Sequence, residues 1–126
     1  MIIGLDHPAI AAENLEKLSN WYCDVLDYEL VLKSEEKPVY ILKSADGTFM
    51  EMMEKDDNSR PGRTLLTAGI SHLAYRVNKL QDAIETLDKA KVQWLSEIVP
   101  AIGGGKLRTF ADPEGNVLQI VDRNAK

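Results

Sequence analysis

Hydrophobic and polar residues follow two periods along this chain, and the periods recur in the same order in each half. A short apolar run over residues 2–11 precedes apolar positions spaced three and four apart over residues 15–26, and that spacing predicts a helix. Strand-like runs follow over residues 28–33, 38–43 and 48–54. The first half therefore predicts a βαβββ unit.

The second half repeats this order after a polar stretch. Residues 55–68 contain Pro61 and Gly62 and follow neither period, so we predict a linker there. A strand, a helix and three strands are then expected over residues 70–77, 80–87, 92–97, 106–111 and 117–122. The prediction is one α+β domain over residues 1–126, with module 1 at about 1–54 and module 2 at about 69–126.

Polar residues mark the start of each predicted helix. Asn14 precedes the first helix and can serve as its N-cap. The segment 78–81, Asn-Lys-Leu-Gln, resembles a capping box for the second helix.

The two halves can be laid directly on each other. Residues 4–7, Gly-Leu-Asp-His, match residues 69–72, Gly-Ile-Ser-His, and residues 47–54 match residues 115–122. His7 and His72 thus fall in equivalent first strands, and Glu51 and Gln119 fall in equivalent last strands.

If two such units pack about a pseudo-two-fold axis, these four side chains converge. Two imidazoles, a carboxylate and an amide oxygen suit a divalent ion such as Zn, Ni, Co, Mn or Fe. The alternative without a metal site is that Glu51 and Gln119 are ordinary polar residues on half-solvated strands. A lone histidine in a strand is also usually not a ligand, so the hypothesis of a metal site depends on the repeat.

Strand alternation predicts the surroundings of these side chains. Phe49 and Met53 share a face with Glu51, and Arg76 shares a face with His72, because alternate strand residues point the same way. The expected lining of a substrate pocket is Tyr40, Phe49, Met53, Arg76 and Arg108. Core packing explains Tyr40, Phe49 and Met53 equally well.

Composition narrows the class of protein. The 126 residues are 44% hydrophobic, enough for a core, and the net charge of -5 argues against nucleic acid or an anionic membrane as a partner. No apolar run reaches the ~18 residues of a membrane span, and the first residues do not resemble a signal peptide. We expect a cytoplasmic protein whose single cysteine, Cys23, is a packed thiol.

Four segments of the chain together resemble the vicinal oxygen chelate superfamily. They are the opening strand with His7, the helix segment 20–28 containing Asn-Trp-Tyr, the strand with His72, and residues 110–119, Phe-Ala-Asp-Pro-Glu-Gly-Asn-Val-Leu-Gln. This superfamily includes glyoxalase I, methylmalonyl-CoA epimerase, extradiol dioxygenases and fosfomycin- and bleomycin-resistance proteins. The resemblance implies two tandem βαβββ modules forming a curved, mostly antiparallel eight-stranded sheet around a metal. It also implies a homodimer, which would cover open sheet edges.

In the glyoxalase and epimerase branches, the resemblance implies the metal ligands His7, Glu51, His72 and Gln119. Many relatives carry Glu where this chain has Gln119, and an amide cannot carry protons at neutral pH. Glu51 is therefore the expected catalytic residue, and Gln119 breaks the ligand triad of the dioxygenase branch.

The function implied is that of a metal-dependent, glyoxalase-like lyase or isomerase. It would chelate neighbouring oxygens of a small-molecule substrate and stabilise an enediolate. The alternative is a metal-free drug- or metabolite-binding protein of the bleomycin-resistance type.

Overall fold

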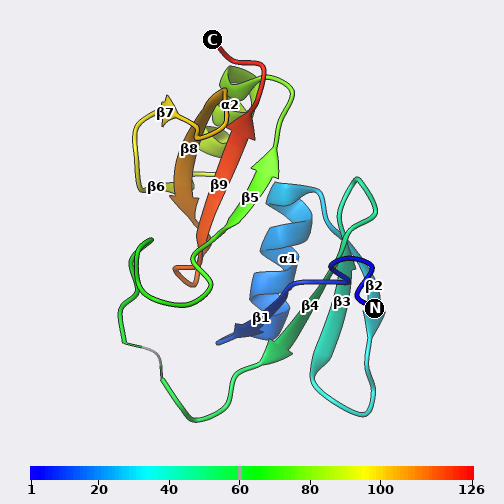
Figure 1. Cartoon of the computed structure of the whole chain (residues 1–126). Helices are drawn as coiled ribbons and strands as arrows, with labels where there is room; N and C mark the ends of the chain where they lie inside the picture. The colour runs from blue at the N-terminus through cyan, green and yellow to red at the C-terminus, as the bar shows by residue number, and fades with distance from the viewer. Residues whose placement is uncertain (60) are drawn as a thin grey trace. The chain divides into compact units, whose positions relative to one another are not determined.

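The computed structural model describes residues 1–59 and 61–126, which form two helices and nine strands arranged in two sheets. The chain divides into two compact units, residues 1–59 and 60–126. Unit 1 contains β1 (Ala9–Ala12), α1 (Leu15–Leu26), β2 (Glu29–Lys33), β3 (Val39–Lys43) and β4 (Phe49–Glu54) (Figure 1). Unit 2 contains β5 (Leu73–Arg76), α2 (Leu80–Lys89), β6 (Gln93–Trp94), β7 (Val99–Pro100), β8 (Lys106–Ala111) and β9 (Val117–Asp122).

The predicted α+β class is confirmed, with one difference in the strand count. Of the run predicted as a strand over residues 92–97, residues 93–94 form the short strand β6, and a second short strand, β7, follows at residues 99–100; both pair with β8. In the described part of the linker, residues 55–59 and 61–68, the structure has no helix or strand. The described helices include none that is long and apolar enough to cross a membrane.

Unit 1 is a four-stranded sheet covered on one face by α1. The strand order is β1-β4-β3-β2, with β1 parallel to β4 and the other neighbours antiparallel. The core consists of side chains that are at most 1% exposed, from α1, β3 and β4: Leu18, Tyr22, Leu42, Met50 and Met52. Because Met50 and Met52 point toward this core, Glu51 between them points to the other face of the sheet.

The first strand is shorter than predicted. It begins at Ala9 rather than near residue 2, directly after Pro8. Proline has no N–H to donate to a neighbouring strand, although the Pro8 carbonyl still accepts a hydrogen bond from the Glu51 amide at 3.0 Å. As predicted, Asn14 caps α1, its side-chain oxygen accepting from the Lys17 amide at 3.0 Å.

Unit 2 repeats the arrangement with the order β5-β9-β8-β6 and β7 added beside β8. Again the first strand, β5, is parallel to the last, β9. Its buried core includes residues of α2, β8 and β9: Leu80, Ile84, Leu87, Phe110, Leu118 and Ile120.

The start of α2 differs from the prediction. The N-cap residue is Lys79, which makes no side-chain capping bond, so the predicted capping box is wrong. The buried Asp122 at the end of β9 accepts from the Leu80 amide at 3.1 Å instead. A neighbouring strand therefore caps this helix.

Candidate metal centre

The strand register places the predicted ligands in the same local geometry in each unit. His7 lies two residues before Ala9, and Ala9 pairs with Glu51 in the parallel ladder of β1 and β4. His72 lies two residues before Ala74, and Ala74 pairs with Gln119 in the parallel ladder of β5 and β9. The sequence repeat is therefore also a repeat of strand pairing.

In unit 1 the two predicted ligands are in contact. The His7 Nε2 atom meets the Glu51 carboxylate, and both side chains are about one-third exposed, at 32% and 30%. The other ring nitrogen, Nδ1, donates to the Asp6 carboxylate at 2.7 Å. This hydrogen bond to Asp6 is the main cause that raises the pKa of His7; partial burial opposes it, and the charge of Glu51 adds to it.

In unit 2 the His72 ring is held by the residue before it. The Ser71 hydroxyl lies 2.8 Å from His72 Nδ1 and donates to the Leu65 carbonyl at 2.7 Å. A hydroxyl has one proton, so the Ser71 oxygen accepts from Nδ1–H. The Nε2 atom of the neutral ring then carries the lone pair.

Gln119 is buried, with 7% of its surface exposed. Its Nε2 amide group donates to the Thr109 hydroxyl, 3.2 Å away on the neighbouring strand β8. The amide oxygen is therefore the atom directed away from Thr109.

Three of the predicted pocket residues share a sheet face with a predicted ligand. Phe49 and Met53 alternate with Met50 and Met52 and so lie on the Glu51 face of β4. Arg76 lies two residues after Ala74, the partner of Gln119, and so shares the Gln119 face. Phe49 is 44% exposed, and it supplies apolar surface beside a carboxylate.

Tyr40 and Arg108, also predicted to line a substrate pocket, lie on the opposite faces of their sheets from Glu51 and Gln119. Tyr40 pairs with the buried Met52, and its hydroxyl donates to Glu16 on α1 at 2.5 Å. Arg108 pairs with Ile120 rather than with Gln119, and its guanidinium stacks 4.1 Å from the Trp94 ring. In each strand it is the next residue, Ile41 or Thr109, that pairs with a predicted ligand.

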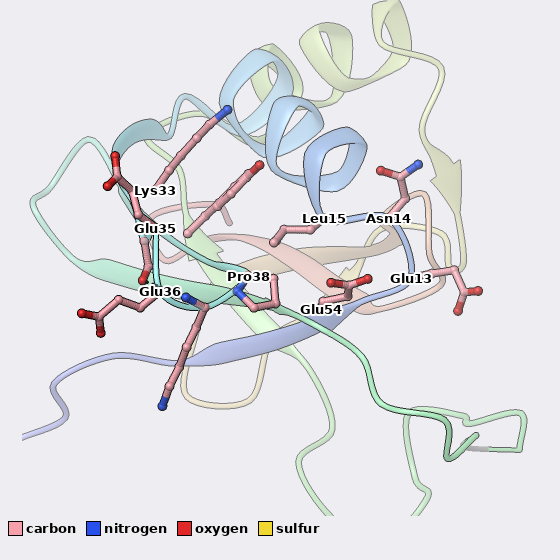
Figure 2. A pocket seen from close by; sticks show the side chains of 11 residues that line it. Glu13, Asn14, Leu15, Lys33, Glu35, Glu36, Pro38 and Glu54 are labelled. Atoms are coloured by element: carbon pink, nitrogen blue, oxygen red, sulfur yellow. Dashed lines mark hydrogen bonds between the residues drawn. The ribbon is translucent and has the colours of Figure 1, made fainter.

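A groove of about 700 Å³ lies at the start of α1, on the same side of the unit 1 sheet as Tyr40. Figure 2 shows the charged side chains around it, which come from the α1 start, the β2–β3 turn and the end of β4. It is lined by residues 13–15, 33–38, 40 and 54. Glu51 points to the opposite face of this sheet, so the groove is separate from the His7–Glu51 pair.

The donor set suits a borderline or moderately hard divalent ion. It consists of two imidazole nitrogens, one carboxylate and one amide oxygen. Each unit supplies two of these four groups, and among the described residues no cluster of three or more His, Cys, Asp or Glu side chains is found. The single cysteine, Cys23, is not a candidate ligand, since burial raises the pKa of its thiol.

Sequence reasoning missed Asp6, Ser71 and Thr109, which form hydrogen bonds with His7, His72 and Gln119. For Asp6 and Ser71 the sequence itself contained a signal. A hydrogen-bonding residue directly precedes the histidine in both halves. The pairing of Thr109 with Gln119 depends on strand register, which the repeat alone does not give.

Comparison with known proteins finds a matching family model and a curated relative. The model of the Glyoxalase/Bleomycin resistance protein/Dioxygenase superfamily matches residues 4–120. Mitochondrial methylmalonyl-CoA epimerase from Mus musculus is 29% identical over 123 residues, covering 90% of this chain and 69% of that protein.

Solved structures share the fold at low sequence identity. A glyoxylase/bleomycin resistance protein/dioxygenase domain from Frankia sp. EAN1pec superposes with a TM-score of 0.79 at 18% identity, covering 98% of this chain and 94% of that one. A mutant of the fosfomycin resistance protein FosX from Listeria monocytogenes, complexed with Mn(II) and 1S,2S-dihydroxypropylphosphonic acid, gives a TM-score of 0.72 at 20% identity, with coverage of 96% and 90%.

Proposed function

This chain belongs to the Glyoxalase/Bleomycin resistance protein/Dioxygenase superfamily, and from that membership we propose that it is a metal-dependent isomerase or lyase acting on a small molecule. His7, Glu51, His72 and Gln119 together bind one divalent ion in this proposal. Glu51 is also the residue that moves a proton. The substrate would carry two neighbouring oxygen atoms able to bind this ion.

One observation carries the proposal: the two halves place a histidine and a last-strand oxygen donor in the same register. In each half the histidine lies two residues before the strand partner of the donor. Polar residues scattered on half-solvated strands have no reason to repeat in this way.

The chain's own groups define the chemical step. A divalent ion held by these ligands would supply positive charge that stabilises an enediolate as it forms. Glu51 accepts a proton from the carbon beside a substrate carbonyl and returns it to a neighbouring atom on the same face of the substrate. Gln119, being neutral and without a titratable proton, only binds. Phe49 and Met53 give the Glu51 face an apolar surface that excludes water from this step.

Two relatives support the choice of substrate class. The mouse relative is, by its name, an epimerase acting on methylmalonyl-CoA, an acyl thioester. The FosX complex contains Mn(II) and a ligand with two neighbouring hydroxyl groups. Both point to small molecules with closely spaced oxygens, and the curated relative favours an isomerase over a lyase.

The test is proton exchange at carbon in deuterated water, followed by NMR on a panel of acyl thioesters, hemithioacetals and hydroxyketones. The parent chain loaded with Mn(II), Ni(II), Co(II) or Zn(II) should exchange at least one panel member. Glu51→Gln should lower this rate by a factor of about 10²–10⁴, the usual contribution of a general base. The Gln119→Glu variant, its counterpart in the other half, should retain metal and activity. Full activity of Glu51→Gln would show that another residue moves the proton.

A second candidate, a metal-free binder of a cationic molecule, is favoured by the groove of unit 1. Four carboxylates line it against two amines, from Glu13, Glu35, Glu36, Glu54, Lys33 and Lys37. This function does not use His7, Glu51 or His72. A cationic ligand whose binding is lost in Glu35→Gln/Glu36→Gln and kept in His72→Ala would favour it.

A further inference from the structure

The hydrogen bonds around the proposed ligands repeat a single pattern. Each ligand that has two different polar atoms uses the non-ligating atom in a bond to a neighbouring side chain. His7 Nδ1 donates to Asp6, His72 Nδ1 donates to Ser71, and Gln119 Nε2 donates to Thr109. The other polar atoms are two imidazole Nε2 atoms and one amide oxygen, and His7 Nε2 contacts the carboxylate of Glu51, itself a proposed ligand. An imidazole Nε2 without its proton and an amide oxygen can each donate a lone pair to a metal.

From this pattern we infer that Asp6, Ser71 and Thr109 are positioning residues that orient the proposed ligands, and that Ser71 also selects the tautomer of His72. The inference rests on the proposed metal function, because it assigns these residues a role toward that ion. Partners of this kind fix the tautomer and the orientation of metal ligands in general. None of the three would touch the metal itself.

Ser71 acts through a chain of two hydrogen bonds. Its hydroxyl proton is committed to the Leu65 carbonyl at 2.7 Å, so its oxygen can only accept from His72. The neutral ring is thereby held as the Nδ1–H tautomer. In the other unit, the Asp6 carboxylate accepts from His7 Nδ1 and orients that ring, whose Nε2 contacts Glu51.

Thr109 orients the Gln119 amide, which, unlike a carboxylate, can bind a metal through only one of its two terminal atoms. The two oxygens of a carboxylate are equivalent, whereas a Gln amide turned by half a rotation presents N–H₂ to the metal instead of oxygen. The residue paired with Gln119 is Thr109, while the residue paired with Glu51 in the other unit is Ile41. A hydroxyl is therefore present opposite the amide and absent opposite the carboxylate.

The first experiment measures the tautomer of His72 in the metal-free full-length chain. Two-bond ¹H–¹⁵N correlation spectra distinguish a protonated Nδ1 from a protonated Nε2. We expect the Nδ1–H tautomer in the parent and a shift toward Nε2–H in Ser71→Ala, with Ser71→Thr restoring the parent pattern. A parent His72 with Nε2–H would overturn the inference.

The second experiment measures Mn(II) or Zn(II) affinity by competition with a chelating dye. Ser71→Ala and Thr109→Val should each weaken binding by about 10- to 100-fold, the usual cost of losing such a partner, and Thr109→Ser should recover it. Thr86→Val removes a threonine hydroxyl on the exposed side of α2 and should bind as the parent does. Circular dichroism and thermal unfolding confirm that each variant is folded.

A double-mutant cycle separates positioning from a merely structural role. In the presence of Gln119→Glu, Thr109→Val should cost less than about threefold in metal affinity, because a carboxylate needs no selection between its atoms. An equal loss in both backgrounds would overturn the role of Thr109. If the parent binds no metal at all, the proposed function fails, and the tautomer spectra alone then decide the inference for Ser71.

Discussion

Replacement of Asp122 by alanine should destabilise the chain more than most single substitutions, because this carboxylate caps α2 from a neighbouring strand. Asp122 is 7% exposed. One oxygen accepts from the Leu80 amide at 3.1 Å and the other from the Asn124 amide at 2.9 Å. In Asp122→Ala both amides lose their acceptor, and Lys79 offers no side-chain bond in its place.

The magnitude follows from what the carboxylate does. Loss of an N-cap costs about 0.5–2 kcal/mol, and hydrogen bonds to a charged group contribute about 1.5–3 kcal/mol. These values overlap, because the bond to Leu80 is itself the cap, so we expect a loss of about 2–4 kcal/mol rather than their sum. Asp122→Asn keeps one acceptor but loses the charge, and should cost about 1 kcal/mol.

The assay is urea unfolding followed by circular dichroism, with Glu54→Ala as the matched control. Glu54 occupies the equivalent last position of β4, but it is exposed, and α1 has its own cap in Asn14. Glu54→Ala should therefore change the free energy of unfolding by less than about 0.5 kcal/mol. If Asp122→Ala is no more destabilising than Glu54→Ala, the capping role of Asp122 is wrong.

Two further predictions follow from particular contacts, and a third concerns the oligomeric state. Gly105→Ala should cost more than about 3 kcal/mol, since an added Cβ would lie 2.1 Å from the Asp122 carbonyl oxygen and φ is +91°; a parent-like unfolding curve would refute the contact. Tyr40→Phe should raise the pKa of Glu16 toward its ordinary value of 4.5, because the Tyr40 hydroxyl bond is the main cause that lowers it. A lowered carboxyl pKa stabilises the fold above the unfolded pKa and loses that effect as pH falls, so parent and variant should differ at neutral pH and converge in acid; a constant difference would contradict this. Light scattering at micromolar concentration should give twice the chain mass of 14.1 kDa, and a monomer mass would refute the predicted homodimer.

The elements of the fold were readable from the sequence because their periods are strong. Both helices and the longer strands lie within a few residues of their predicted bounds, and Asn14 caps α1 as its residue type indicates. The errors in the predicted element boundaries occur where a proline, or a contact with a residue distant in the sequence, overrides the local sequence pattern. Pro8 delays β1 to Ala9, and the capping segment at 78–81 is replaced by Asp122, which lies over 40 residues further along the chain.

Strand alternation places Phe49 and Met53 on the same face as Glu51 within one strand, but it does not relate residues on different strands. The repeat places His7 with Glu51 and His72 with Gln119, because a match of equivalent strands needs no knowledge of register. Tyr40 and Arg108 were chosen by residue type, and the register turns both to the opposite face. A shift of one residue along a strand turns a side chain to the other face of the sheet. The pocket residues of a short strand can therefore be identified only when its pairing with the neighbouring strand is known.

The most direct test of the account is the metal content of the chain purified without a histidine tag. Inductively coupled plasma mass spectrometry should find about one divalent ion per chain, because the proposal has four ligands on each chain and one ion for each set of four. His72→Ala should lower the bound metal at least about tenfold, and Asp122→Asn, on the opposite face of β9 from Gln119, should not. Equal metal content in His72→Ala and the parent, or none in either after incubation with Mn(II), Co(II), Ni(II) and Zn(II), would contradict the central claim.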